Sequence, residues 1–301
     1  MANSPELVMV AGPNGSGKST LIAALRASPD IYLPKLYINA DDILRDEGLS
    51  DPGQAQQQAQ FRRAKALQGR EDLMYETVMS HPSKIAELQL AKQAGYLITI
   101  HLVATNDPDI NVERVGARVH AGGHDVPEDR IRARYERTLA LAPAALGYAS
   151  QALIFDNTAR GATAKGLQLQ AQLDDGSIAL TVPTAAEWVR TIVGQVQERA
   201  TELDRFARVQ RLNTGIADLN GSTRGQIIAI GKHYALQYDE ATGSGVLHDK
   251  CILGNAAFSN LQPNQHYSIT YAQGVATPER LPGREPDRKS TRLNSSHVSQ
   301  S

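Results

Sequence analysis

The chain has 301 residues, of which 41% are hydrophobic and 21% are charged, the balance of an ordinary globular protein. Its formal net charge of -1 excludes an overall positive field, so direct binding to nucleic acid or to an anionic membrane is not expected. A single cysteine excludes an internal disulfide, and no apolar run reaches the roughly 18 residues of a membrane span, so we expect a cytoplasmic protein.

Short apolar runs alternate with helical patterns through the first half of the chain. Five such runs fit buried strands, at residues 7–11, 36–40, 73–75, 96–104 and 152–155. Helical stretches lie between them, for example at 85–94 and 130–141, and the glutamine-rich stretch 54–60 is predicted to be a polar helix. Unbroken apolar strands separated by helices are typical of a parallel sheet covered on both faces. The sequence therefore predicts a doubly wound α/β domain, whose ligands bind at the carboxyl ends of the strands.

Beyond residue 156 the pattern changes. The runs 167–173 and 177–182 flank Asp174-Asp175-Gly176, which is a hairpin signal and predicts two antiparallel edge strands. A long helix is predicted to follow and to end at residue 208, which closes the first domain, 1–208. The polar stretch 209–223 is predicted to be a linker.

The last part of the chain is predicted to be a small, separate β domain over residues 224–278. Its short strand-like runs are separated by turns rich in Gly, Asp and Asn. Residues 279–301 are rich in Pro, Arg and Ser and are predicted to be disordered. Within them, residues 288–301 resemble translated sequencing-adapter sequence, and we expect them to be an artefact.

A glycine-rich segment follows the first predicted strand and opens a helix. It fits the pattern G-x-x-x-x-G-K-[ST], in which the glycines let successive N–H groups point at one phosphate and the helix N-terminus adds partial positive charge. Lys18 would reach the β- and γ-phosphates and Ser19 would bind Mg²⁺, roles that a ligand-free glycine turn does not require. An ATP and Mg²⁺ site is therefore predicted, with nucleotide contacts from Gly12, Pro13, Asn14, Gly15, Ser16, Gly17, Lys18, Ser19 and Thr20.

Two acidic residues follow the second predicted strand, in Asn39-Ala40-Asp41-Asp42. A carboxylate at this edge of the sheet could accept the proton of an acceptor hydroxyl as it attacks the γ-phosphate. We assign this role to Asp41 and a helix-capping role to Asp42. The alternative is that Asp41 merely caps the following helix.

Another carboxylate, Glu76, ends the third apolar run at the same edge, and Thr77 follows it. Glu76 could bind the acceptor or the metal shell, and the alternative is a solvated glutamate at a strand end. A usual Walker B strand is not obvious, which argues against a large motor-type ATPase. Residues 152–156 come nearest to that pattern, and we expect them to line the nucleotide base.

Arginines are densest between residues 112 and 137. Arg114 and Arg118 lie four positions apart and so share one helix face. The segment 122–127 breaks the helix, and a second helix then presents three more arginines on one face: Arg130, Arg134 and Arg137. We predict a lid whose arginines stabilise charge on a transferring phosphoryl group. The alternative is a solvated helix pair, salt-bridged through Glu113, Asp125, Asp129 and Glu136.

Taken in order, these motifs resemble the zeta-toxin family of P-loop kinases over residues 5–157. The Walker A loop is shared by many families, but the ordered series is more specific. Besides that loop, the matching pieces are Asn39–Asp41, Glu76-Thr77, Arg118–Pro127, Ile131–Arg137 and Phe155–Asn157.

The resemblance implies a P-loop kinase fold and an ATP-dependent phosphotransferase that acts as a toxin. Its acceptor would be the 3′-hydroxyl of the amino sugar in UDP-N-acetylglucosamine, a sugar nucleotide, and an antitoxin protein is a candidate partner. Asp41 would be the base, while Glu76, Thr77 and His124 would contact the substrate and Asn157 the nucleotide. Arg114 would act on the transferred group together with a second lid arginine. Because the family's second arginine falls near His124, the candidates here are Arg118 and Arg134.

Two other functions stay open at this point. The first is a kinase for another acceptor, such as a nucleoside or an antibiotic hydroxyl. The second is a non-catalytic ATP-binding switch of a plasmid or mobile element, which would have no need of a base such as Asp41. The C-terminal β domain resembles the KfrB-like domain of plasmid proteins, and we expect it to be an interaction module.

Overall fold

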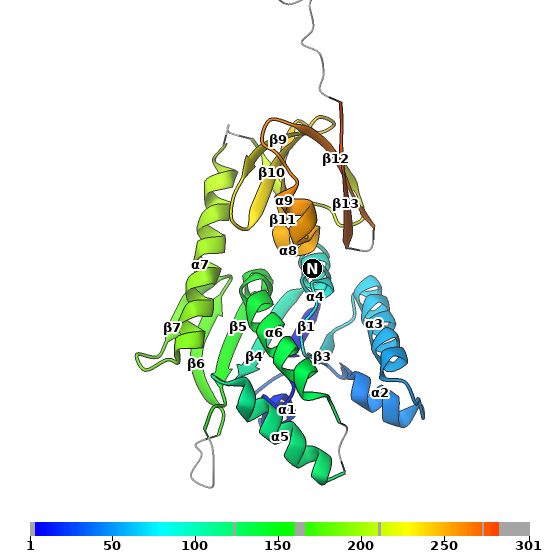
Figure 1. Cartoon of the computed structure of the whole chain (residues 1–301), viewed down its shortest axis with the longest axis vertical. Coiled ribbons are helices and arrows are strands. Elements are labelled where there is room, and N and C mark those ends of the chain that lie inside the picture. Colours follow the sequence, from blue (N-terminus) through cyan, green and yellow to red (C-terminus); the bar gives the residue numbers. More distant parts are fainter. Residues whose placement is uncertain (1–3, 123–124, 160–165, 210–211, 273, 283–301) are drawn as a thin grey trace, which may run out of the picture. The chain divides into compact units, whose positions relative to one another are not determined.

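The computed structural model describes residues 4–122, 125–159, 166–209, 212–272 and 274–282. The chain divides into two compact units, Met1–Arg205 and Phe206–Ser301. Figure 1 colours both units along the sequence, from blue to red. Among the described residues, no helix combines the length and the apolar character needed to cross a bilayer.

The first unit is built on a mixed sheet, in which the described strands run in the order β2-β3-β1-β4-β5-β6-β7 (Figure 1). Its strands are β1 (Glu6–Ala11), β2 (Leu36–Ile38), β3 (Leu73–Thr77), β4 (Leu97–Ala104), β5 (Gln151–Asp156), β6 (Gln168–Asp174) and β7 (Ser177–Thr181). The first five pair in parallel, and β6 and β7 extend the sheet antiparallel. The α/β fold predicted from the apolar runs is confirmed.

The hairpin between β6 and β7 is also confirmed. Asp175 and Gly176 both have positive φ, at 45° and 74°. Two left-handed residues give the turn that matches the twist of an antiparallel pair, and Asp-Gly is one of the dipeptides that favour it strongly.

Seven helices of the first unit lie within the described residues. They are α1 (Lys18–Ala27), α2 (Ala40–Asp46), α3 (Pro52–Gly69), α4 (Ser83–Gln93), α5 (Pro108–His120), α6 (Glu128–Tyr148) and α7 (Glu187–Ala207). The glutamine-rich stretch is helical as predicted, in α3. The backbone N–H of Ala186, just before α7, donates to the side chain of Gln170 on β6 at 2.9 Å, which ties the start of this helix to the sheet.

The core of the first unit fixes α1 against the sheet. Side chains alternate along β1, so Val8 and Val10 face Leu21 and Leu25 of α1 in one buried cluster with Val103 of β4. Fully burying an aliphatic side chain of this size contributes about 1.5–3 kcal/mol. The loop that joins β1 to α1 is therefore held at both ends by rigid, packed elements.

The second unit is a β sheet in which the described strands run in the order β13-β12-β9-β10-β11-β8. Its elements are β8 (Thr214–Ile216), β9 (Ser222–Ile230), β10 (Tyr234–Asp239), β11 (Ser244–Asp249), α8 (Lys250–Leu253), α9 (Asn255–Ser259), β12 (His266–Ala272) and β13 (Val275–Arg280). The stretch predicted to be a linker contains β8, because this short polar segment pairs in parallel with β11. The last strand runs to Arg280, beyond the predicted end at residue 278, and pairs antiparallel with β12.

A buried polar network lies inside this second sheet. The side chain of Gln237 donates to the carbonyl oxygens of Gly225 and Tyr267 at 3.0 and 2.8 Å, so its own oxygen is an acceptor. His248 Nε2 lies 3.0 Å from that oxygen and Nδ1 lies 2.8 Å from the hydroxyl of Tyr271. Nε2 therefore carries the proton of a neutral ring, and burial lowers the pKa of His248 to about 3. The described residues contain no cluster of His, Cys, Asp and Glu that could hold a metal ion.

Candidate active site

The glycines of the loop between β1 and α1 are required by its geometry. Gly12 has a φ of 156°, and a Cβ there would collide with the carbonyl oxygen of Val103. Gly17 has a φ of 103°, and a Cβ there would collide with the side-chain amide of Asn157. The loop thus adopts a curled conformation that L side chains rarely adopt, which is how backbone N–H groups converge on an anion.

Lys18 is the first residue of α1 and its side chain is buried. Nζ donates to the carbonyl oxygens of Gly12 and Pro13 at 2.9 and 3.0 Å and lies 3.7 Å from Oε1 of Glu76. Burial lowers the pKa of Lys18, and the negative charges of Glu76 and Asp41 oppose that shift. The ammonium group is therefore held beside the loop and lines a cavity, where it can bind a polyanion.

The same loop contains a buried hydroxyl, Ser16 Oγ, that has no hydrogen-bond partner among the described residues. The backbone around it is braced from two sides: Asn157 Nδ2 donates to Ser16 O at 2.8 Å, and Asn111 Nδ2 donates to Asn14 O at 2.6 Å. A rigid, curled loop with an unpaired hydroxyl and a buried lysine fits the phosphates of a nucleotide.

Asn111 was not singled out in the sequence, although it supports the loop from α5. Its signal was its position, three residues before Arg114, which places both on one face of that helix. Its side-chain oxygen accepts the hydroxyl proton of Thr105, so the amide is oriented toward the loop.

A cavity of about 1020 Å³ opens over the loop. Most of the predicted site residues line it together: Asn14, Gly15, Gly17, Lys18, Ser19, Thr20, Asp41, Glu76, Thr77, Arg114, Arg118, Arg134 and Asn157. Gly12, Pro13 and Ser16 are buried in the loop and do not line the cavity. His124 lies outside the described residues.

Asp41 lies in the first turn of α2. The strand that precedes it was predicted to run to residue 40, but β2 ends at Ile38 and the helix begins at Ala40. Asn39 is the N-cap: its backbone is extended, and its Oδ1 accepts the N–H of Asp41 at 2.8 Å. The predicted capping role of Asp42 is therefore wrong, because the helix begins at Ala40. Asp42 instead forms an exposed ion pair with Arg45 at 3.0 Å. Asp41 is left free of a capping role, on the wall of the cavity.

Glu76 belongs to a small polar group at the end of β3. Nδ2 of Asn39 lies 3.4 Å from Oε2 of Glu76 and donates to the hydroxyl of Tyr37 at 3.0 Å. Burial raises the pKa of Tyr37 to about 12, so this hydroxyl stays protonated. Thr77 follows, and its hydroxyl accepts the N–H of Met79 at 3.0 Å. Glu76 is thus fixed between Lys18 and the cap of α2, unlike a solvated glutamate.

The two helices predicted to form a lid are α5 and α6. Arg114 donates to the carbonyl oxygen of Ala159 at 3.1 Å, and Arg134 lies 3.4 Å from the side-chain oxygen of Asn14. Burial, followed by the positive charges of Arg130 and Arg137, lowers the pKa of Arg134.

The remaining arginines of this region differ in their contacts. Arg130 lines the cavity, whereas Arg137 donates to the carbonyl oxygen of Ser80 at 3.2 Å. On these two helices, Arg132 forms ion pairs with Asp109 at 2.6 Å and with Glu128 at 2.7 Å. Cations of both helices therefore face one cavity that also holds Lys18.

Residues 152–156, which were predicted to line the nucleotide base, are not among the residues that line the cavity. Asp156 Oδ1 accepts the indole N–H of Trp188 at 2.9 Å and the hydroxyl proton of Thr158 at 2.7 Å. The bond from Trp188 ties β5 to α7, and both donors hold the carboxylate of Asp156 in place. The cavity reaches the next residue instead, Asn157.

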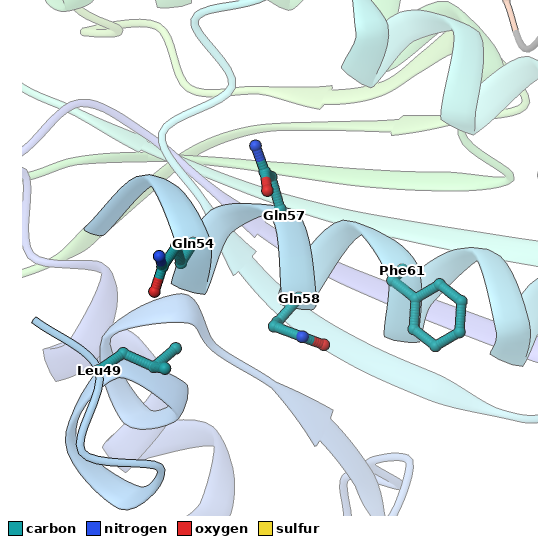
Figure 2. A pocket seen from close by; sticks show the side chains of 5 residues that line it. All are labelled: Leu49, Gln54, Gln57, Gln58 and Phe61. Carbon is teal, nitrogen blue, oxygen red and sulfur yellow. The ribbon is translucent and has the colours of Figure 1, made fainter. Parts of the chain in front are cut away.

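The cavity also extends to residues that the sequence did not bring to attention. They lie on α3, on α4 and in the segments that precede these helices: Asp51, Gly53, Gln56, Arg63, His81 and Lys84. A separate hollow of about 450 Å³ lies beside α3, lined by Leu49, Gln54, Gln57, Gln58 and Phe61 (Figure 2). It has no charged lining residue, so it does not fit a polyanion.

Two family models match separate parts of the chain. Residues 7–141 match a model described as an AAA domain, and residues 222–280 match a model described as the KfrB domain. An uncharacterized protein of Haemophilus influenzae is 29% identical over 128 residues, which is 42% of this chain and 91% of that protein. Residues 7–141, which match the AAA-domain model, contain the loop, Asp41, Glu76, α5 and part of α6.

Several solved structures are similar in part. A putative kinase from Chloroflexus aurantiacus is 22% identical, covering 45% of this chain and 79% of that chain, with a TM-score of 0.35. The PezAT toxin–antitoxin system of Streptococcus pneumoniae is 15% identical, and the match covers 67% of this chain and 88% of that chain, with a TM-score of 0.40. The AvrRxo1-ORF1:-ORF2 complex with ATP is 14% identical, and the match covers 75% of this chain and 69% of that chain, with a TM-score of 0.47.

Proposed function

We propose that the first unit is an ATP-dependent phosphotransferase that phosphorylates a hydroxyl group of a small molecule. The observation that carries this proposal is the presence of Lys18, Asp41 and the lid arginines around one cavity. A nucleotide site alone would need the first of these, but a carboxylate that faces the same space is the group that a hydroxyl acceptor requires.

The residues of the loop fit ATP and Mg²⁺. The curled backbone from Gly12 to Ser19 would hold the phosphates, Lys18 would neutralise them, and the hydroxyl of Ser19 would bind the metal ion. Bound ATP would supply the phosphoryl group. Asn157 and Asn111 keep the loop in shape through their bonds to Ser16 O and Asn14 O.

Asp41 would accept the proton of the acceptor hydroxyl. It is exposed to the cavity, and its backbone N–H, not its carboxylate, is used by the cap of α2. Glu76 would orient the acceptor, because its carboxylate is fixed by Lys18 and Asn39 on the same side of the cavity. Arg114, Arg118 and Arg134 would stabilise the negative charge that the transferring group carries.

For the acceptor, we propose a sugar nucleotide such as UDP-N-acetylglucosamine, and with it a toxin activity that an antitoxin protein would restrain. The resemblance of the ordered motifs to zeta-toxin kinases supports this choice. For the second unit, we propose an interaction module of KfrB type, which the match over residues 222–280 supports.

The test is incubation of the full chain with ATP and Mg²⁺ and a panel of acceptors, followed by mass analysis for added phosphate. The panel contains sugar nucleotides, free sugars, nucleosides and hydroxyl-bearing antibiotics. Phosphate on a sugar nucleotide supports the proposed reaction and acceptor, and phosphate on another compound corrects the acceptor. ATP binding without transfer to any of them would favour an ATP-binding switch.

A further inference from the structure

Three charged side chains form a compact cluster in the wall of the cavity, on the face of α3 and α4. Arg63 Nε lies 2.8 Å from Oε1 of Glu87, and Lys84 Nζ lies 3.0 Å from Oε2 of the same carboxylate. The side chains are 5%, 14% and 12% exposed for Arg63, Lys84 and Glu87. They are thus nearly withdrawn from water, unlike ordinary surface ion pairs.

The cluster carries one positive charge more than its single carboxylate can neutralise. Although burial acts to raise it, the two cations hold the pKa of Glu87 below its usual range. Burial lowers the pKa of Lys84, the charge of Glu87 opposes this shift, and the charge of Arg63 adds to it. Withdrawing two cations from water for one carboxylate is costly, because each desolvated ion requires a partner. The arrangement would be stabilised by a second anion.

The two cations face the cavity, whereas the carboxylate that joins them does not line it. Arg63 and Lys84 are both lining residues, and Glu87 is not. A cluster that served only to join α3 to α4 would need one cation and one carboxylate. The geometry presents the surplus charge to the cavity.

The charged groups of Arg63 and Lys84 also contact an aromatic ring. The ring of Tyr75 lies under both, 5.0 Å from the guanidinium carbon of Arg63 and 6.0 Å from Nζ of Lys84. Glu76, the residue that follows Tyr75 on β3, lines the same cavity as Arg63 and Lys84. Lys84 lies in the first turn of α4, whose N-terminus adds partial positive charge.

We propose that Arg63 and Lys84 form an anion subsite that binds a phosphate or carboxylate group carried by the acceptor. Glu87 is a positioning residue that holds both head groups toward the cavity. The identification of the ligand as the acceptor rests on the proposed function, because the phosphates of ATP already have Lys18 and the curled loop. The subsite selects acceptors that carry an acidic group near the hydroxyl, and it disfavours neutral nucleosides and cationic antibiotics.

The test uses inorganic phosphate as the probe and the full chain saturated with a non-hydrolysable ATP analogue and Mg²⁺, so that the nucleotide's own phosphate sites are filled. The dissociation constant of phosphate is measured by thermal shift at constant ionic strength, with acetate in a parallel titration. The variants are Arg63→Gln, Lys84→Gln and the charge-retaining Lys84→Arg. Lys65→Gln is the matched control, because Lys65 is an exposed lysine of α3 outside the cavity lining.

Each charge-removing variant is expected to weaken phosphate binding at least about tenfold, the usual effect of losing a charge-assisted hydrogen bond. Lys84→Arg and Lys65→Gln are expected to stay within about threefold of the unmodified chain. Tighter binding of acetate than of phosphate, lost in the same variants, would assign a carboxylate to the subsite. Absence of oxyanion binding to the unmodified chain, or equal binding by Arg63→Gln and Lys84→Gln, would overturn the proposal.

The outcome is separable from that of the proposed function. Phosphate binding that depends on Arg63 and Lys84, without phosphoryl transfer to any acceptor, would retain the subsite and reject the kinase. Transfer to a neutral acceptor, at the same rate in Lys84→Gln, would retain the kinase and reject the subsite.

Discussion

The side-chain oxygen of Asn39 accepts the backbone N–H of Asp41 at 2.8 Å, and this bond separates two roles that the sequence leaves combined. The cap of α2 belongs to Asn39, so the carboxylate of Asp41 is available for chemistry. The other side-chain atom of Asn39, Nδ2, lies 3.4 Å from Glu76. One amide thus fixes the start of α2 relative to the carboxylate at the end of β3.

Asp41→Asn is expected to slow phosphoryl transfer by about 10²–10⁴-fold, the usual contribution of general-base catalysis, because an amide cannot accept the hydroxyl proton. ATP affinity should change little, since the loop is untouched. Both quantities are measured on the same preparation. Asp42→Asn is the matched control: its carboxylate pairs with Arg45 on the surface, and its loss should leave the rate unchanged.

Near-normal transfer by Asp41→Asn would remove the main reason for preferring a kinase over an ATP-binding switch. Weakened metal-dependent nucleotide binding would instead assign Asp41 to the Mg²⁺ shell. Loss of the N-cap does not explain a changed rate in Asp41→Asn, because the cap of α2 is Asn39.

Lys18→Ala is expected to abolish transfer, because the positive charge held at the mouth of the loop is lost while the glycines keep the backbone curled. ATP turnover and binding are compared with those of Lys35→Ala, an exposed lysine that does not line the cavity. Normal turnover by Lys18→Ala would contradict a phosphate-binding role for this side chain.

A fragment of residues 1–208 is expected to melt cooperatively and to bind ATP. Strands β1 to β7, the loop, α5 and α6 all lie in the first compact unit, which ends at Arg205. Calorimetry and nucleotide titration of the fragment, compared with the full chain, provide the measurement. A fragment without a cooperative transition would mean that the first unit depends on the second for its stability.

The second unit is expected to lose stability as the pH falls below about 6.5, the ordinary pKa of histidine. His248 is neutral in the folded sheet, where burial lowers its pKa to about 3, while the unfolded chain binds a proton at higher pH. Between these two values the unfolded state gains about 1.4 kcal/mol for each pH unit, as an upper estimate for a buried group. Hydrogen exchange in peptides from residues 222–249 measures this loss.

His248→Gln is expected to be less stable at neutral pH and to show a flatter pH dependence, because the titrating group is gone. His120→Gln, at an exposed position of α5, should keep the pH dependence of the second unit. An unchanged slope in His248→Gln would place the acid sensitivity elsewhere.

The strands of the first unit could be predicted because buried parallel strands have unbroken apolar sequences, and the hairpin because Asp175-Gly176 has few other conformations. The cap of α2 could not be assigned in the same way. Asn39, Asp41 and Asp42 are all good capping residues, and only the position of Ala40 as the first helical residue decides between them.

The groups that the sequence did not reveal depend on contacts between distant residues. The pair of Arg63 and Glu87 joins two helices, and Asp156 meets Trp188 across 32 positions. The parallel pairing of β8 with β11 is likewise non-local, so its three residues looked like a polar linker. Local patterns predicted the edge of the sheet at which the cavity lies. They did not predict that side chains of α3 and α4 also line it.

The bond between Trp188 and Asp156 gives the protein an optical reporter of its own. Trp188 is the single tryptophan of the chain, and its indole N–H donates to the residue that precedes Asn157. Asn157 in turn holds the loop through Ser16 O. The loop is thus connected to the indole ring of Trp188 through two hydrogen bonds and one peptide unit. A shift of the loop when a ligand fills the cavity should reach the fluorophore by this path. Intrinsic emission, without an attached dye, should follow nucleotide binding in real time, and Asn157→Ala should uncouple the signal from the binding event.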